Sequence, residues 1–176
     1  MYRRVLLAYD GSIQGRMALR EGALLAKQWA SQVFLLAVIP ENPGTHLAEG
    51  IWPGGTGGER ERYLSVLEGG VARLRQIGLD PVSRFAQGDP IRQIQAFARE
   101  VDADLIVVGH RPQKFFDRWW SGSADVHLVD NTYCTVLVAR NFVDDETFDA
   151  ELQRIEQARA LQQPPEVKPM ADPVER

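Results

Sequence analysis

Five short apolar runs, separated by stretches of helical periodicity, constrain the fold of this chain more than any other feature. The runs are rich in leucine or β-branched residues and lie at Val5–Tyr9, Val33–Ile39, Val82–Ala86, Leu105–Gly109 and Thr135–Ala139. Three of them are apolar throughout, which is typical of strands buried on both faces. Strands that alternate with helices favour a parallel sheet with right-handed crossovers. The sequence therefore predicts an α/β fold: a doubly wound five-stranded parallel sheet with helices on both faces.

Four helices are expected between the strands. Ser12 has the chemistry of an N-cap for the first helix, and Asp89 followed by Pro90 is a typical start for the third. Gly78 ends the second helix, and a short fourth helix fits Ser123–Asn131. The expected apolar stripe of the first helix is Ile13, Met17 and Leu24, widened on one side by Ala18 and Leu25. The expected stripes of the other two helices are Tyr63, Leu67, Val71, Leu74 and Ile77 in the second, and Ile91, Ile94, Phe97 and Val101 in the third.

The chain divides into three parts on this reading: an α/β domain over residues 1–140, an acidic amphipathic helix over 141–163, and a disordered proline-rich tail over 164–176. Within the domain, glycine and proline crowd residues 40–58, which we expect to form a long loop. The apolar stripe of the tail helix is Phe148, Leu152 and Ile155. An isolated helix of this length is marginal in water, so we expect it to contact its own domain or a partner subunit.

Charge and composition exclude several classes of function. The net charge is −4, which disfavours a nucleic-acid-binding protein. The excess of acids lies in residues 141–176, which contain nine acidic and four basic side chains. Cys134 is the only cysteine, so neither an intrachain disulfide nor a multi-cysteine metal site is expected. The longest apolar run, Val33–Pro40, is far too short to span a bilayer, and the first residues do not form a signal peptide. We expect a cytoplasmic protein that binds no membrane and no metal of its own.

The carboxyl ends of the strands are where a sheet of this kind binds ligands. Asp10 follows the first strand and can accept hydrogen bonds from a ribose or a base, although Asp-Gly-Ser is also good turn chemistry. Gly122 and Ser123 open the last helix, where free N–H groups and the helix dipole hold phosphate, although an ordinary helix cap would use the same residues.

These residues resemble the universal stress protein family over about residues 1–140. The resemblance rests on Val5–Ser12, on Asp104–Arg111, and on Gly122-Ser123 leading to the last strand. Nucleotide-binding members carry glycine, two residues, glycine, nine residues, then glycine and serine or threonine. Gly109 and Gly122-Ser123 fill the outer positions of that motif at the expected spacing, and Pro112 replaces the middle glycine.

The resemblance implies the following site. Adenine would lie near Ala8, Asp10 and Val38, and the ribose beside Val108 and Gly109. The phosphates would lie on the last helix, with positive charge nearby from the linker that precedes it. The complete set of binding positions is Ala8, Asp10, Val38, Val108, Gly109, Arg111, Pro112, Gly122, Ser123 and Ala124.

The family resemblance implies a stress-response regulator, not an enzyme, that binds ATP together with Mg²⁺. It also implies a homodimer formed through the last strand, where Val136 and Val138 would make an apolar edge. The alternative is a dimeric interaction module of the same family that binds no nucleotide. Two departures from the motif favour that alternative: Pro112 has no N–H to donate, and the carboxylate of Asp125 could repel phosphate.

Overall fold

The sheet of this protein is parallel throughout, and its first strand lies in the middle. The computed structural model describes residues 1–40, 56–110 and 132–162. The strands are β1 (Arg4–Ala8), β2 (Gln32–Pro40), β3 (Val82–Gly88), β4 (Leu105–Gly109) and β5 (Thr135–Ala139). They pair in parallel in the order β3-β2-β1-β4-β5, so the predicted five-stranded parallel sheet is confirmed. The chain winds outward from β1 in both directions.

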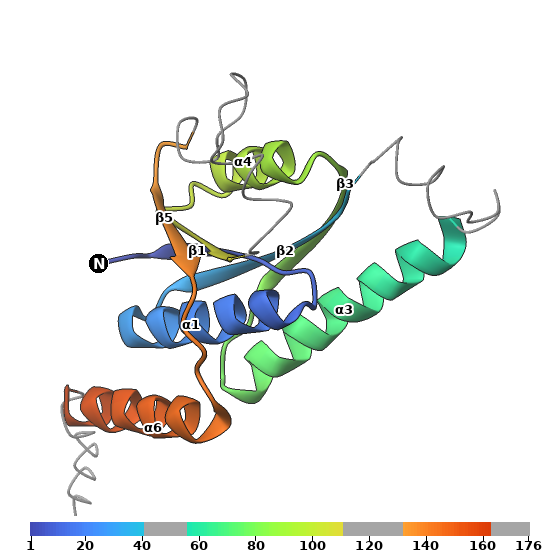
Figure 1. Ribbon diagram of the computed structural model, residues 1–176. Coiled ribbons are helices and arrows are strands. Elements are labelled where there is room, and N and C mark those ends of the chain that lie inside the picture. Colours follow the sequence, from blue (N-terminus) through green and yellow to red (C-terminus); the bar gives the residue numbers. More distant parts are fainter. Residues whose placement is uncertain (41–55, 111–131, 163–176) are drawn as a thin grey trace, which may run out of the picture.

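Helices cover both faces of the sheet, as predicted. The helices that follow the strands are α1 (Ile13–Trp29), α3 (Thr56–Gln76) and α4 (Pro90–Glu100). Helices α1 and α3 lie on one face, and α4 lies on the other (Figure 1). The alternating side chains of the strands form a separate core on each face: Leu7 packs toward α1 and α3, and Leu6 packs toward α4. The predicted short helix Ser123–Asn131 lies outside the described residues.

Helix starts agree closely with the expected capping residues. The Oγ atom of Ser12 accepts a hydrogen bond from the N–H of Gly15 at 3.0 Å, and Oδ1 of Asp89 accepts one from Arg92 at 2.9 Å. Helix α3, in contrast, begins at Thr56, inside the segment 40–58 that we expected to be a loop. Helix propagation is cooperative, and a glycine costs only about 1 kcal/mol relative to alanine, so the helix continues through the glycines near its start.

The apolar stripe expected for α1 is wrong in its three large residues, whereas Ala18 and Leu25, which widen it, belong to the core or pack against it. The face that packs on the sheet is made mostly of small residues: Gly15, Ala18, Leu19, Gly22, Ala23 and Ala26. Ile13 is 59% exposed, and Met17 and Leu24 are only half-buried. A Cβ atom at Gly22 would lie 2.3 Å from Cδ2 of Leu7. The helix therefore packs too close to β1 for larger side chains, and its bulkier residues lie to the side.

The tail helix, α6 (Asp145–Gln162), packs against α1 on the side away from the sheet (Figure 1). Arg20 of α1 forms an ion pair with Asp145, donates to the carbonyl oxygen of Val143 at 2.6 Å, and lies over the ring of Phe148. Farther along, Lys27 forms an ion pair with Glu156 at 3.0 Å.

Apolar contact supplements these polar links. Ile155 is buried and Phe148 and Leu152 are half-buried, so the stripe expected for the tail helix is its packed face. Residues 164–176, expected to be disordered, lie outside the described part of the chain. Among residues 1–40, 56–110 and 132–162, no helix has the length and apolar character needed to cross a membrane.

Candidate functional site

The strand order reverses between β1 and β4, and the predicted site residues that the structure describes lie at or just beyond the carboxyl ends of the strands around this point. A crevice at such a reversal is the usual ligand site of an open parallel sheet. The structure brings together those contributed by β1, β2 and β4: Ala8, Asp10, Val38, Val108 and Gly109. The other five predicted residues lie outside the described residues: Arg111, Pro112, Gly122, Ser123 and Ala124.

Three of these residues form an apolar wall on the α4 face of the sheet. Ala8 and Val108 lie side by side, because Leu7 and Val107 are partners in the register of β1 and β4. Val38 lies on β2, two residues beyond Leu36, the partner of Ala8. All three pack against the core cluster of α4, with Val108 buried and Ala8 and Val38 half-buried. An apolar wall of this kind at the carboxyl ends of strands suits the flat face of a ring.

Asp10 lies at the edge of this wall and is bound to the first turn of α1. Its Oδ1 atom accepts hydrogen bonds from the N–H of Ser12 at 2.9 Å and from the Ser12 hydroxyl at 2.6 Å. A Cβ atom at Gly15 would lie only 2.4 Å from the same oxygen. The carboxylate therefore sits against a helix N-terminus, where the dipole favours negative charge. The turn-forming role weighed from the sequence is present, and it holds the carboxylate in a fixed position.

Gly109 is in close contact with the start of α1. A Cβ atom there would lie 2.4 Å from the carbonyl oxygen of Gln14 and 2.9 Å from the nitrogen of Gly15. The N–H of the next residue, His110, donates to the carbonyl oxygen of Ala139 at 3.0 Å, which extends the pairing of β4 with β5. Glycine is thus required at position 109 by the packing of β4 on α1, whatever the crevice binds.

Gly15 was not among the predicted site residues, although it completes this arrangement. It touches both Asp10 and the position that a side chain at Gly109 would occupy. The sequence offered one signal, a glycine three residues after the N-cap of the first helix, where a better helix former would be expected. Gly15 and Gly109 together allow the end of β4, the start of α1 and Asp10 to approach closely.

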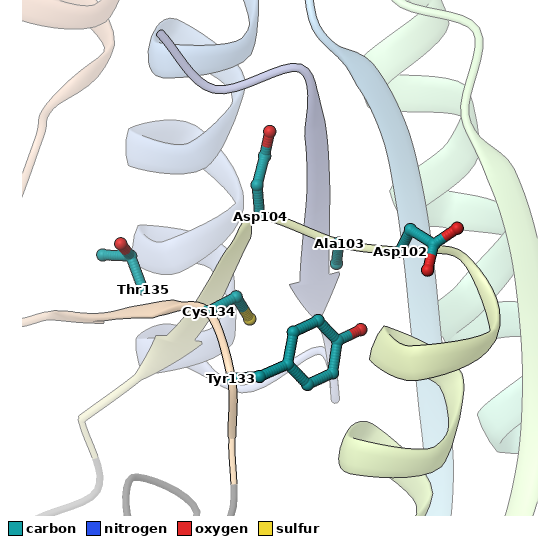
Figure 2. A pocket seen from close by; sticks show the side chains of 6 residues that line it. All are labelled: Asp102, Ala103, Asp104, Tyr133, Cys134 and Thr135. Carbon is teal, nitrogen blue, oxygen red and sulfur yellow. The ribbon is translucent and has the colours of Figure 1, made fainter.

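A second cavity, of about 520 Å³, opens at the opposite end of the sheet, before β4 and β5. Figure 2 shows its lining side chains, which come from residues 102–104 and 133–135. The carboxylate of Asp104 accepts hydrogen bonds from the N–H groups of Arg3 and Arg4 at 2.7 and 3.0 Å. The hydroxyl of Tyr133 donates to the carbonyl oxygen of Ala98 at 2.6 Å. These polar groups connect β1, β4 and α4, so their role here is structural.

Cys134 in this second cavity is a poor nucleophile. Burial, reinforced by the negative charge of Asp104, raises the pKa of its thiol. The reactive form of cysteine is the thiolate, and a raised pKa keeps the thiol protonated at neutral pH. None of the five predicted site residues in the described part of the chain lines this cavity. The carboxyl ends of β1, β2 and β4, where Ala8, Val38, Val108 and Gly109 lie, are therefore the better candidate for the functional site.

Comparison with known proteins places the fold in a described family. The model of the universal stress protein family matches residues 1–140. Universal stress protein MJ0531 of Methanocaldococcus jannaschii is 26% identical over 141 residues, which cover 80% of this chain and 83% of that protein. A universal stress protein solved in complex with cAMP is 19% identical, with a TM-score of 0.59 over 80% of this chain and 99% of that one. A family member from Arabidopsis thaliana, solved with AMP bound, is 20% identical, with a TM-score of 0.55 over 81% of this chain and 94% of that one.

Proposed function

This chain belongs to the universal stress protein family, and from that premise we propose that it binds an adenine nucleotide, ATP, and acts as a regulator. The observation that carries the proposal is the position of Asp10 beside the apolar wall of Ala8, Val38 and Val108, at the reversal of strand order. Two structural neighbours, solved with cAMP and with AMP, support an adenine nucleotide as the ligand.

Each group in the proposed site has a physical role. The apolar wall would hold the adenine ring, and the carboxylate of Asp10, fixed by Ser12, would accept a hydrogen bond from the base or the ribose. The phosphates would be held by the residues that the family motif assigns to them, Gly122, Ser123 and Ala124. Arg111 and a bound Mg²⁺ would offset the negative charge of the phosphates. A regulatory role is proposed because these groups all serve binding, and none is assigned a catalytic part.

The charge of Asp10 provides a direct test. Replacing Asp10 by asparagine keeps an oxygen that can accept from Ser12, removes the negative charge and replaces the second acceptor oxygen by an NH2 donor. A hydrogen bond to a charged group contributes about 1.5–3 kcal/mol, so ATP affinity should fall about tenfold or more. Calorimetric titration with ATP, ADP and AMP, with and without Mg²⁺, measures the change.

Asp89→Asn is the matched control. Asp89 is also an aspartate that follows a strand and accepts from the start of a helix, but it serves α4 after the edge strand β3. ATP affinity should be the same in this variant as in the parent protein. Equal ATP affinity in Asp10→Asn and in the parent would remove Asp10 from the site. Absence of ATP binding in the parent would favour the alternative, an interaction module without nucleotide, as would be expected if Pro112 weakens the phosphate site.

We also propose that the protein forms a homodimer through β5, an edge strand of the sheet. The N–H of Thr135 donates to the carbonyl oxygen of Asp104, and the carbonyl oxygen of Ala139 accepts from His110, so these residues direct their backbone groups toward β4. Backbone groups alternate in direction along a strand, so those of Val136 and Val138 point to the free edge. An edge of this kind pairs readily with a second strand.

Proline at position 138 should prevent this pairing. Val138→Pro removes an N–H that points to the free edge and leaves the N–H groups directed toward β4 in place, and proline is tolerated on edge strands. We expect light scattering to give the mass of two chains for the parent protein and of one chain for Val138→Pro at micromolar concentration. Val138→Ile keeps the N–H and should remain dimeric. A parent protein that is monomeric, or a proline variant that is still dimeric, would contradict the proposed interface.

A further inference from the structure

A cavity of about 380 Å³ lies between α1, the end of α3 and the segment that leads into α6, outside the residues assigned to the nucleotide site. Its volume is within the range of small-molecule sites. Its apolar lining includes Ile13, Met17 and Phe142, and its cationic lining consists of Arg16, Arg20 and Arg73. Three elements that are distant in the sequence thus contribute to one concave surface.

The apolar part of this cavity is unusually exposed to solvent. Ile13 is 59% exposed and Phe142 is 72% exposed, and both belong to the small set of large apolar side chains that the described residues leave in water. Single exposed apolar residues are common, but two that line the same cavity suggest a binding surface. Met17, half-buried beside them, has a flexible side chain that adapts to ligands of different shape.

The charges around the cavity leave a surplus of positive groups. Arg20 and Asp145 neutralise one another in their ion pair. Asp144 caps α6 by accepting from the N–H of Thr147 at 2.7 Å, a hydrogen bond that lowers the pKa of its carboxyl. Both acids that line the cavity are therefore engaged. Arg16 on α1 and Arg73 on α3 are exposed, and within the described part of the chain neither belongs to an ion pair.

We propose that this cavity is a second ligand site, for a small amphipathic carboxylate such as a medium-chain fatty acid. The carboxylate binds between the guanidinium groups of Arg16 and Arg73, whose paired N–H donors fit its two oxygens. The hydrocarbon chain lies along Ile13 and Phe142 and removes them from water. A single negative charge fits better than a dianion, because Asp144 and Asp145 line the same cavity. The site is separate from the proposed nucleotide function and goes beyond it.

Calorimetric titration of the full chain with octanoate, below its micelle concentration and in the absence of nucleotide, tests this site. Octanoate should bind. Octylammonium carries a positive charge and inorganic phosphate has no hydrocarbon chain, so neither should bind. The double variant Arg16→Gln/Arg73→Gln should weaken octanoate binding at least about tenfold, because it removes two charge-assisted contacts. Arg75→Gln is the control, since Arg75 lies on the same turn of α3 but pairs with Asp80.

A second variant tests the apolar contact independently of charge. Phe142→Ser changes a side chain that is already largely exposed, so the melting temperature should be preserved while octanoate affinity falls several-fold. Octanoate affinity that is equal in the parent, the double arginine variant and Phe142→Ser would overturn the proposal. Equal binding of octylammonium would also overturn it, since nonspecific adsorption of the chain would then explain the signal. None of these outcomes depends on whether the crevice beside Asp10 binds ATP.

Discussion

Replacing Gly109 by valine is expected to lower the free energy of unfolding by about 3 kcal/mol, at the upper end of the usual cost of overpacking. The added Cβ would lie 2.4 Å from the carbonyl oxygen of Gln14. That oxygen belongs to the backbone of α1, so no side-chain rotation relieves the clash, and either the end of β4 or the first turn of α1 must move. Urea denaturation followed by circular dichroism measures the loss.

Gly69→Ala supplies the control for this prediction. Gly69 lies within α3, and a Cβ atom there meets nothing within 4 Å. Alanine in the interior of a helix is favoured over glycine by up to about 1 kcal/mol, so this variant should be slightly more stable than the parent. If Gly109→Val unfolds at the same urea concentration as the parent, the start of α1 is more adaptable than its hydrogen bonds indicate. The nucleotide affinity of a Gly109 variant can be interpreted only when its stability is known, because a loss of folding would also lower the affinity.

Shortening Ile155 to alanine is expected to cost about 2 kcal/mol, at the lower end of the range for a buried isoleucine. Ile155 is 6% exposed at the contact of α6 with α1. The loss of stability cannot exceed the free energy by which α6 binds to α1. If the cavity left by the substitution would cost more than that, α6 detaches from the domain and no cavity remains. A lower urea m-value in the variant would report such detachment, since less surface then remains to be exposed in the main transition.

Leu161→Ala is the control for Ile155→Ala, because it removes a large apolar side chain from the same helix at a position that is not packed. Leu161 lies near the end of the same helix and is 88% exposed, so its loss should leave the stability within about 0.5 kcal/mol of the parent. If both variants behave like the parent, the contact between α6 and α1 contributes little in solution, and the amphipathic stripe of the tail serves another purpose.

The sheet could be predicted because its signal is local and strong. Runs such as Leu105–Gly109 are apolar throughout, and the helical stretches between them leave few alternatives to a parallel arrangement. Capping at Ser12 and Asp89 is equally local, because one side-chain oxygen serves the next few N–H groups. These predictions require only neighbouring residues.

The packed face of α1 could not be read in the same way. Hydrophobic periodicity selects large side chains, so it favoured Ile13 and Met17, whereas close approach to β1 selects small ones such as Gly22. That requirement depends on Leu7, a residue of another element, so the small residues at helical spacing in α1 do not by themselves show that they form its packed face.

For the candidate site, the topology placed Asp10 correctly at a strand end, but the contact among Asp10, Gly15 and Gly109 is again tertiary. Only the folded chain shows that these glycines are needed for packing. The phosphate-binding half predicted at Gly122, Ser123 and Ala124 rests on the sequence motif, because those residues lie outside the described part of the structure.

Helix α1 contacts both the tail helix and the candidate site. One of its faces lies on the sheet and the opposite face carries α6, while its first turn holds Asp10 through Ser12. A helix of 17 residues is about 25 Å long and behaves as a stiff rod on this scale. Lys27, where α6 is attached, and the turn that holds Asp10 therefore lie near opposite ends of one stiff helix.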